Sequence, residues 1–403
     1  MSIPQAQIDK YLQLSKAAIE NCPEYPEGKY EGRGVVICGG GLKYFTCAWV
    51  AIKMLRHMGC QLPVELWHLG KKEMDNKMKK LIEPLGVTTR DAYEEVKTHP
   101  VRNKPLGGWE LNPYSIIHSK FEEILFLDAD NVVILNPEYL FETNEYRKTG
   151  AIFWPDYGRL ARTRDIWKMC GVAHRDEPEF ESGQIVIDKK RCWRELNLTM
   201  HLNEHSDYYY KYVHGDKETY HMAWHMLDTK YSMPSKGIHR LPAVMCQHDF
   251  WGNRVFQHRN LDKWNLRGEN NTIAGFLHED LCKKYLKELT NKWDGIISDK
   301  PIQDLRDREL AGLIDELKEK RYLYIREGHD QRPMRLLNGG LIGEGGNALE
   351  MIWWMSKPRG VPTLNIGANQ DNITCTMTRD SVGVWKGAWL QFEKMPVTLR
   401  VIG

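Results

Sequence analysis

Short apolar runs alternate with longer amphipathic stretches early in the chain, and this alternation most restricts the possible folds. The run 34–38 breaks into three glycines, and residues 44–58 then carry apolar side chains at helical spacing. A second run, 63–68, precedes the charged helical stretch 71–82, and a third strand is expected at 123–128. Strands that alternate with helices predict a parallel sheet covered on both faces. We therefore expect an α/β, Rossmann-like domain.

The second part of the chain has a different character, with short runs rich in Gly, Thr, Val and Trp. Strand-like runs separated by turn residues predict a small β-rich, sandwich-like module. The predicted organisation is therefore a domain over 1–299, a charged helical connector over 300–329 and the module over 330–403. Four tryptophans of the module either form its core, which we favour, or offer a platform to a sugar: Trp353, Trp354, Trp385 and Trp389.

Charge and cysteine content exclude several classes of protein. The 403 residues include 56 Lys and Arg against 54 Asp and Glu, a net charge of +2, whereas binding to duplex nucleic acid or an anionic membrane needs a basic excess or cluster. Nine scattered cysteines without a C-x-x-C pair predict reduced thiols and a cytoplasmic location. The polar N-terminus does not resemble a signal peptide. The sequence contains no apolar stretch of ~18 residues, so no membrane-spanning helix is expected.

Two aspartates, Asp128 and Asp130, stand at the exit of the buried strand 123–128. Side chains that leave the carboxyl end of a strand in an open α/β sheet point into the crevice where ligands bind. Their side chains converge if the chain turns there, as Asn131 and Pro137 allow. Paired carboxylates in such a crevice suit Mn²⁺ or Mg²⁺ holding a diphosphate. The alternative is a turn with a helix-capping aspartate, because a D-x-D is frequent by chance.

The three glycines Gly39, Gly40 and Gly41 follow the first strand and open a helix. Such a turn lets backbone amides approach a nucleotide. The segment is neither a G-x-G-x-x-G dinucleotide site nor a P-loop with G-K-[ST]. The alternative is a tight strand-to-helix turn without a ligand.

Several segments of the first 265 residues match the motifs of a known family. They are 36–41 with Tyr44, 109–113, 119–131 with 137–141, 153–156, 181–184 and 215–218. Together they resemble the fungal-type α-mannosyltransferase family and, more distantly, the glycogenin-like retaining glycosyltransferases. The resemblance covers about residues 33–265, and the block around Asp128 is its most specific part. It departs at Asn112, where family members often carry a lysine.

The resemblance implies a GT-A fold and transfer of a sugar from a nucleotide-diphospho-sugar to a hydroxyl acceptor such as a glycan. It also implies dependence on Mn²⁺ or Mg²⁺ and retention of configuration, which gives an α linkage. Two alternatives stay open. One is a glycosyltransferase that modifies a nucleic-acid base, as in phage DNA modification. The other is a nucleotide-sugar- or glycan-binding protein without turnover.

A late histidine is the third metal ligand that the resemblance implies. The segment Phe-Gln-His-Arg-Asn-Leu-Asp-Lys-Trp is similar to the glycogenin-like H-x-x-G-x-x-K-P-W motif, although it lacks the Gly and the Pro and its lysine is one residue nearer. The implied metal ligands are Asp128, Asp130 and His258, with Lys263 on the donor phosphates. His248 remains as a competing histidine.

The resemblance also assigns residues to the donor and to the transferred sugar. The expected donor-binding residues are Gly39, Gly40, Gly41, Tyr44, Asp128, Asp130, Gln184 and Lys263. Two carboxylates are expected to act on the sugar: Asp216 on its reactive face and Asp156 on a hydroxyl. Asp216 precedes a predicted helix, so its alternative role is that of an N-cap, which is compatible with the first role.

Overall fold

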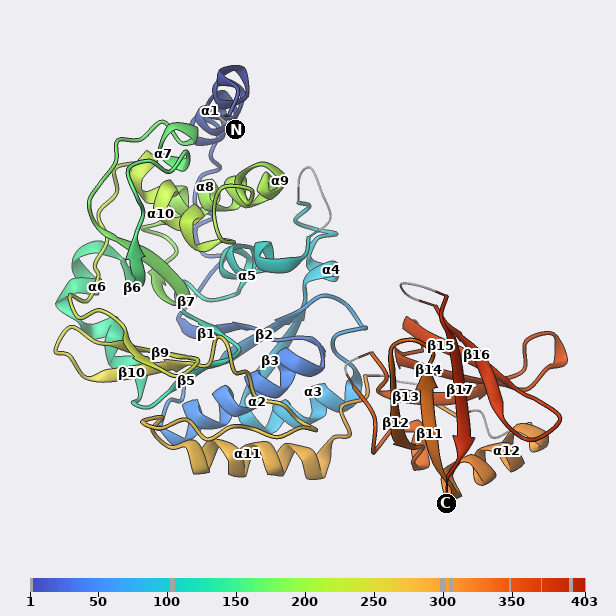
Figure 1. Ribbon diagram of the computed structural model, residues 1–403. Coiled ribbons are helices and arrows are strands. Elements are labelled where there is room, and N and C mark those ends of the chain that lie inside the picture. Colours follow the sequence, from blue (N-terminus) through green and yellow to red (C-terminus); the bar gives the residue numbers. More distant parts are fainter. Residues whose placement is uncertain are drawn as a thin grey trace. The chain divides into compact units, whose positions relative to one another are not determined.

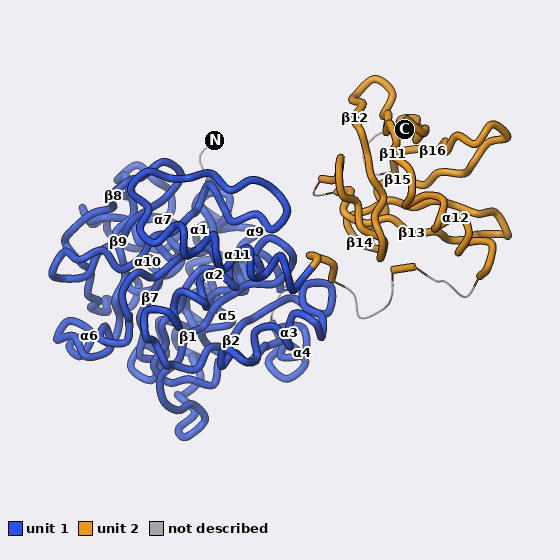
Figure 2. Tube along the Cα trace, turned by 90° about the horizontal axis from the view of Figure 1, so that it is seen from below, with its two compact units in different colours: residues 1–293 blue, residues 294–403 orange. Residues whose placement is uncertain are grey.

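The computed structural model describes residues 3–101, 106–297, 302–303, 307–347, 349–370, 372–390 and 394–402 (Figure 1). The chain divides into two compact units, Met1–Trp293 and Asp294–Gly403 (Figure 2). The boundary expected at residue 299 falls outside the described residues.

The first unit is built on a six-stranded mixed sheet. Its strands are β1 (Arg33–Cys38), β2 (Val64–His68), β3 (Val87–Asp91), β4 (Glu123–Asp128), β6 (Ala151–Arg159) and β7 (Pro178–Asp188). The strand order is β3-β2-β1-β4-β7-β6. The four strands β3, β2, β1 and β4 run parallel, and β7 runs antiparallel to both β4 and β6. The α/β, Rossmann-like prediction is confirmed, and the β6–β7 pair is an antiparallel addition to it.

Helices cover both faces of this sheet (Figure 1). On one side lie α2 (Gly41–His57), α3 (Asn76–Ile82) and α11 (Glu279–Lys292); on the other lie α5 (Leu111–His118), α8 (Trp193–Glu204) and α10 (Lys217–Met226). Helix α1 (Gln5–Glu20) packs on α8. Shorter helices are α4 (Ala92–Glu95), α6 (Asn144–Thr149), α7 (Ile166–Met169) and α9 (Ser206–Tyr209), with 3-10 turns at Glu83–Leu85, Gly108–Glu110 and Pro137–Glu142.

Helix α2 shows why the apolar spacing produces this layer. Phe45, Trp49 and Ile52 recur at helical intervals and are fully buried. The indole N–H of Trp49 donates to the backbone oxygen of Tyr285 on α11 at 2.8 Å, so the two helices are joined across the layer. Leu286 and Leu289 of α11 are likewise buried.

A second, four-stranded antiparallel sheet places a distant segment beside the end of β4. It contains β5 (Asn131–Val133), β10 (Arg254–His258), β9 (Val244–His248) and β8 (His239–Leu241), in the order β5-β10-β9-β8. Strand β5 begins directly after Asp130, and its register pairs Asn131 with His258. The pairing therefore brings the late histidine to the acidic pair.

The second unit contains one continuous antiparallel sheet rather than the predicted two-sheet sandwich. Its strands are β11 (Arg321–Arg326), β12 (Asp330–Arg335), β13 (Ile352–Ser356), β14 (Thr363–Asn369), β15 (Asn372–Arg379), β16 (Trp385–Trp389) and β17 (Pro396–Val401), with short 3-10 turns at Asn338–Gly340 and Pro358–Gly360. The order β12-β11-β17-β16-β15-β14-β13 joins all seven strands. Alternating apolar and polar residues fit either arrangement, and only the strand pairing distinguishes them.

The predicted connector over 300–329 is instead part of this second unit. Helix α12 (Arg308–Glu319) places Leu310, Ile314 and Leu317 in the same apolar core as the strands, and β11 belongs to the sheet. The charged residues of α12 lie on its other face, which is why the segment looked like a solvated connector.

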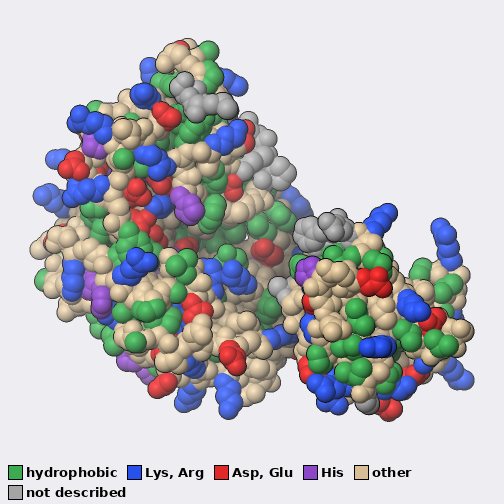
Figure 3. Space-filling model, in the orientation of Figure 1, with side chains coloured by type: hydrophobic (Ala, Val, Ile, Leu, Met, Phe, Trp, Pro, Cys, Tyr) green, Lys and Arg blue, Asp and Glu red, His purple; other side chains and the backbone are tan. Residues whose placement is uncertain are grey.

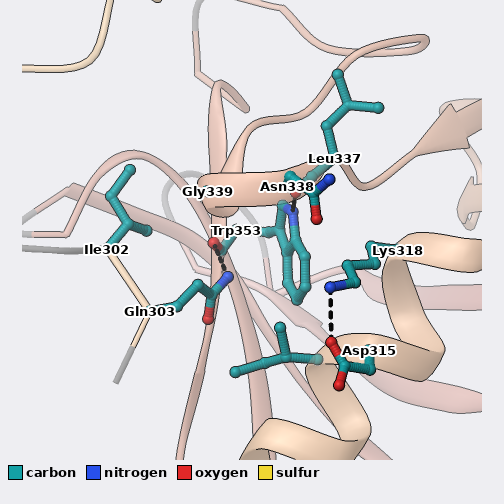
Figure 4. Close-up of a pocket in the computed structure, with 9 residues that line it drawn as sticks. Ile302, Gln303, Asp315, Lys318, Leu337, Asn338, Gly339 and Trp353 are labelled. Atoms are coloured by element: carbon teal, nitrogen blue, oxygen red, sulfur yellow. Dashed lines mark hydrogen bonds and ion pairs between the residues drawn. The ribbon is translucent and has the colours of Figure 1, made fainter. Parts of the chain in front are cut away.

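The four tryptophans of this unit are buried, so the core interpretation is confirmed. Trp353 also borders a pocket of about 290 Å³ between α12 and the turn after β12 (Figure 4). Its indole N–H donates to the backbone oxygen of Leu337, and its own backbone oxygen accepts from Gln303 at 3.0 Å. Because the Trp353 side chain has no exposed surface, it offers no face to a sugar. The core tryptophans are Trp353, Trp354, Trp385 and Trp389.

The surface agrees with the near-balance of charge. On the face of the first unit seen in Figure 3, basic and acidic side chains are interspersed. Among the residues that the structure describes, no helix is long and apolar enough to cross a membrane.

Candidate functional site

A pocket of about 380 Å³ lies at the carboxyl ends of β1 and β4, where ligands bind in open α/β sheets. The N-terminal end of α2 and the turn before α5 form further parts of its wall. It is lined by Cys38, Gly39, Gly40, Tyr44, Leu69, Glu73, Gly108, Trp109, Leu111, Asn112, Asp128, Ala129, Asp130 and Lys263. Six of the eight predicted donor-binding residues, including both members of the acidic pair, thus meet with Asn112 in one cavity.

Asp128, Asp130 and His258 form a compact group at this pocket. Nε2 of His258 lies 3.2 Å from Oδ1 of Asp130 and 3.6 Å from Oδ2 of Asp128. One ligand atom from each of the three residues falls within 4.8 Å of the others, which is close enough to share one metal ion. Two carboxylates and an imidazole are a donor set that suits a hard or borderline divalent cation. The residues predicted as metal ligands are therefore brought together.

The charges of this group are strongly interdependent. Burial works to raise the pKa of Asp130, but His258 and Lys263 outweigh it and hold that pKa well below its usual range. Burial alone would lower the pKa of His258, but Asp130 and Glu181 hold it well above the usual value. Desolvation and the charge of Asp130 raise the pKa of Asp128. A divalent cation would relieve this clustering of negative charge.

Lys263 enters the same pocket from the segment after β10. Its ammonium contacts Oδ2 of Asp130 and donates to the backbone oxygen of Asn260 at 3.0 Å. The ring of Tyr44 lies with its centroid 5.9 Å from this ammonium. A lysine so placed beside the acidic pair is positioned to meet an anionic ligand there, as the resemblance implied. The competing His248 is not part of this group; it lies buried on β9, and its backbone oxygen accepts from Trp154.

Asp216 is held at the base of α10 by two side chains from other elements. Nδ2 of Asn112 donates to Oδ2 at 3.2 Å, and Oγ of Ser182 donates to Oδ1 at 3.3 Å. Burial raises the pKa of Asp216 to about 7, although both hydrogen bonds work to lower it. Asp216 occupies the N-cap position of α10, but its side chain makes no capping hydrogen bond, so the N-cap alternative is wrong for the carboxylate.

The glycine turn is closely packed, and two of its three backbone amides are already hydrogen-bonded within the protein. A Cβ on Gly39 would lie 2.8 Å from Leu66, and a Cβ on Gly40 would lie 2.4 Å from a carboxylate oxygen of Glu73. The amide of Gly39 donates to Trp67 and that of Gly41 to Glu73. Gly41 has φ +72°, which favours glycine, and is not among the lining residues. The prediction that the amides of all three glycines are available to a nucleotide is therefore wrong.

Asp156 lies outside the pocket of the acidic pair. It borders a separate, open pocket of about 560 Å³ together with the exposed ring of Tyr157. Lys217, the residue after Asp216, contacts Asp156 and pairs with Glu179 at 2.9 Å. The carboxylate of Asp156 therefore pairs with the residue after Asp216 and does not line the pocket of the acidic pair.

Gln184 is fully buried on β7 and is not among the residues that line the pocket. Its Oε1 accepts from Nδ2 of Asn131 at 2.7 Å, so it supports the turn after the acidic pair. Gln184 therefore supports this turn and does not line the donor pocket, although its predicted role in donor binding required it to do so.

The family resemblance implied an acceptor-side turn at residues 181–183, but the sequence did not predict the contacts that Glu181, Ser182 and Gly183 make. Oε1 of Glu181 lies 3.3 Å from Nδ1 of His258 and orients the ring. A Cβ on Gly183 would lie 2.6 Å from the same nitrogen, so only glycine leaves room for the imidazole. The motif 181–184 marked this segment, but nothing in the sequence shows that it packs on His258.

The chain matches a family of known proteins. The model of the family described as "Mannosyltransferase putative" matches residues 32–177 and 172–242. An α-1,2-mannosyltransferase of Candida albicans, MNN24, is 29% identical over 267 residues, and one of Saccharomyces cerevisiae, MNN5, is 27% identical over 283 residues. These matches cover 55% and 56% of this chain but only 37% and 48% of the relatives. The chain thus spans less than half the length of either relative.

A solved structure, the mannosyltransferase Ktr4p from S. cerevisiae, is 12% identical with a TM-score of 0.36, and the match covers 58% of this chain and 78% of that chain. Likeness at this level does not by itself identify a fold.

The sheet order β3-β2-β1-β4-β7-β6 and an acidic pair at the end of β4 define the first unit as a GT-A type, Rossmann-like domain. Since the family model spans residues 32–242, more than half of the chain, the chain belongs to the fungal-type α-mannosyltransferase family.

Proposed function

We propose that the first unit transfers a mannosyl residue from a nucleoside diphosphate donor to a hydroxyl group of a glycan, with a divalent cation and with retention, which gives an α linkage. The observation that carries the proposal is the meeting of Asp128, Asp130, His258 and Lys263 at one pocket. Mannose and the α linkage are taken from the names of the relatives, and retention is implied by the family resemblance. The divalent cation and the diphosphate donor are supported by the chemistry of the pocket.

The residues present fit Mn²⁺ or Mg²⁺, because Asp128, Asp130 and His258 offer two carboxylates and one imidazole within reach of a single ion. When bound, the ion neutralises the charge that develops on the leaving diphosphate. Glu181 contacts the other nitrogen of His258 and keeps the ring in a ligating orientation.

The chain's own residues bind and orient the donor. The ammonium of Lys263 adds positive charge where the diphosphate leaves. Exposed rings of Tyr44 and Trp109 on the pocket wall offer flat faces to a base or sugar. Asp216 is fixed by Asn112 and Ser182, so its carboxylate is oriented in advance for the sugar.

We also propose a cytoplasmic location. All nine cysteines are unpaired thiols in the structure, as a reducing compartment requires. The oxidation state of the thiols in protein isolated from its native cells tests this proposal.

The test is incubation of the full chain with a panel of nucleotide-sugars and Mn²⁺. The expected result is release of nucleoside diphosphate from a mannose donor, faster when a mannose-containing oligosaccharide is added, with an α-linked product by NMR. Asp128→Asn is the inactive control. Donor binding without release would favour the binding-only alternative, and transfer to DNA would favour the base-modifying one.

A further inference from the structure

A second group of potential metal ligands lies away from the donor pocket. Glu177 directly precedes β7, and His221 and His225 stand on α10. Nε2 of His221 lies 2.9 Å from Oε1 of Glu177, and Nε2 of His225 contacts the same oxygen. The three ligand atoms fall within 4.8 Å of one another. None of the three residues lines the donor pocket.

The spacing of the two histidines is that of helical metal ligands. Residues i and i+4 lie on one face of an α-helix, so His221 and His225 present their rings side by side, with centroids 4.5 Å apart. Both histidine side chains are fully buried, whereas Glu177 is about a quarter exposed. The group is therefore buried on the side of the two histidines and reaches solvent only past the carboxylate.

The surroundings order this group and shield it. The ring of Phe180 stacks on His221 at 4.3 Å, and that of Trp167 stacks on His225 at 6.1 Å. The hydroxyl of Tyr231 donates to Oε2 of Glu177 at 2.6 Å, which fixes the carboxylate while Oε1 faces the two imidazoles.

Hydrogen bonding among these groups is incomplete. Within the described part of the chain, Nε2 of His225 has no hydrogen bond of acceptable geometry, although it is aimed at Oε1 of Glu177 and is inaccessible to water. Buried polar atoms are normally paired, so such an atom calls for a partner.

We propose that Glu177, His221 and His225 bind a structural Zn²⁺ ion. Two imidazoles and a carboxylate are typical zinc ligands. Bonds of about 2.0 Å in a tetrahedron place ligand atoms roughly 3.3 Å apart, so the carboxylate moves only slightly from its present position. The fourth ligand is a water molecule on the side open to solvent.

The ion would join α10 to the residue that precedes β7. Asp216 directly precedes α10 and accepts a hydrogen bond from Ser182 on β7. A metal link between these two elements therefore holds the Ser182–Asp216 contact in place. The zinc ion thus supports the donor site without touching it.

A third histidine group provides a matched control. Glu95, His99 and His118 are also close together, but the ammonium of Lys29 lies 3.0 Å from Nε2 of His99. Nδ1 of His99 faces Oε1 of Glu95 at 2.8 Å, so the ammonium lies at the other nitrogen of the same ring. Its positive charge repels a second cation, and no zinc is expected there.

The experiment is zinc binding to the full chain after treatment with a chelator and its removal. Zn²⁺ is titrated against a chromophoric chelator, and Co²⁺ is used as a spectroscopic substitute with its visible absorption recorded. The wild-type protein is compared with His221→Gln, Glu177→Gln, His99→Gln and His258→Gln. We expect one tight equivalent and a tetrahedral Co²⁺ spectrum in the wild type, in His99→Gln and in His258→Gln.

The affinity of that equivalent is expected to fall on the order of 100-fold or more in His221→Gln and Glu177→Gln. Circular dichroism shows whether His221→Gln folds. If it does not, Glu177→Gln, which keeps the size of the side chain, tests the zinc site by itself. The absence of a tight equivalent in the wild type would overturn the proposal. So would a zinc ion that is lost in His258→Gln and retained in Glu177→Gln, because that ion would belong to the donor pocket.

Discussion

Nδ2 of Asn112 lies 3.2 Å from Oδ2 of Asp216, although 104 residues separate the two. The contact joins the start of α5 to the start of α10 beneath the donor pocket. The donor to the buried carboxylate is therefore a neutral amide and not a cation. Because the contact is a neutral–anion hydrogen bond in a buried position, it affects the protonation of Asp216 as well as its orientation.

This contact leads to a prediction about pH dependence. Burial raises the pKa of Asp216 to about 7 and the Asn112 hydrogen bond opposes that rise, so Asn112→Ala is expected to raise the pKa further. A hydrogen bond to a charged group is worth about 1.5 kcal/mol, which corresponds to a shift of roughly one pH unit. The acid limb of the kcat/KM profile should move to higher pH, with activity lost at pH 7 and recovered near pH 8–9. The control is Asn21→Ala on the exposed end of α1, and an unmoved limb would show that Asp216 need not be ionised.

Loss of one carboxylate of the acidic pair is expected to abolish transfer. Asp128 is about 30% exposed at the pocket, so Asp128→Asn removes a ligand charge with little effect on packing. The rate should fall by ~10²–10³ or more, because stabilisation of the leaving diphosphate is lost. Release of nucleoside diphosphate measures the rate, and thermal unfolding checks the fold. Asp176→Asn, at an exposed surface aspartate, should behave as the wild type. Wild-type activity in Asp128→Asn would refute the metal assignment.

Removal of the divalent cation should silence the enzyme reversibly. EDTA is expected to stop nucleotide release, and excess Mn²⁺ should restore it, since the three ligands at the pocket persist without the ion. The measurement is the rate before chelation, after it and after addition of Mn²⁺. Full activity in the chelator would mean that Lys263 and His258 neutralise the diphosphate by themselves.

Gly183→Ala is expected to weaken the metal site without touching a ligand. The added Cβ would lie 2.6 Å from Nδ1 of His258 and 2.7 Å from Oε1 of Glu181, so the ring must shift. The Mn²⁺ concentration for half-maximal rate should rise by roughly 10–100-fold, the usual effect of disturbing the support of a ligand. In the control Gly158→Ala, the nearest atom would lie 3.8 Å away and no change is expected. Equal Mn²⁺ dependence in both variants would contradict the role of His258.

A chain that ends at residue 297 is expected to fold and to bind the donor. The first unit has its own core, and every residue that we assign to the donor lies before residue 265. Binding of a nucleoside diphosphate with Mn²⁺, measured by calorimetry, should match that of the full chain. Aggregation of the shortened protein would indicate that the second unit covers an apolar surface of the first.

Much of the first unit could be predicted because its strands are short apolar runs that end in recognisable turns. Gly34–Cys38 and Glu123–Asp128 are examples, since each is bounded by residues that cannot continue a strand in the core. Sheet pairing was not predictable in the same way. The antiparallel addition of β7 to β4 depends on contacts between distant segments, and an alternating pattern does not reveal its neighbour.

The second unit shows the same limit. Its strands were recognised, but α12 was taken for a connector because its six charged residues outnumber its three buried ones. Leu310, Ile314 and Leu317 lie on one face of the helix. That face is recognised as part of the core only when the sheet that it packs against is known.

The sequence by itself determined the alternation of strands and helices, the acidic pair at the exit of β4 and the family to which these motifs belong. These features are local, because they depend on residues within a few positions of one another. The tertiary structure decided which distant groups complete the site. The β5–β10 register brings His258 to Asp130, and the packing of α5 and β7 against the start of α10 brings Asn112 and Ser182 to Asp216. Such pairings are set by how whole elements bury their apolar faces, so no short stretch of sequence contains them.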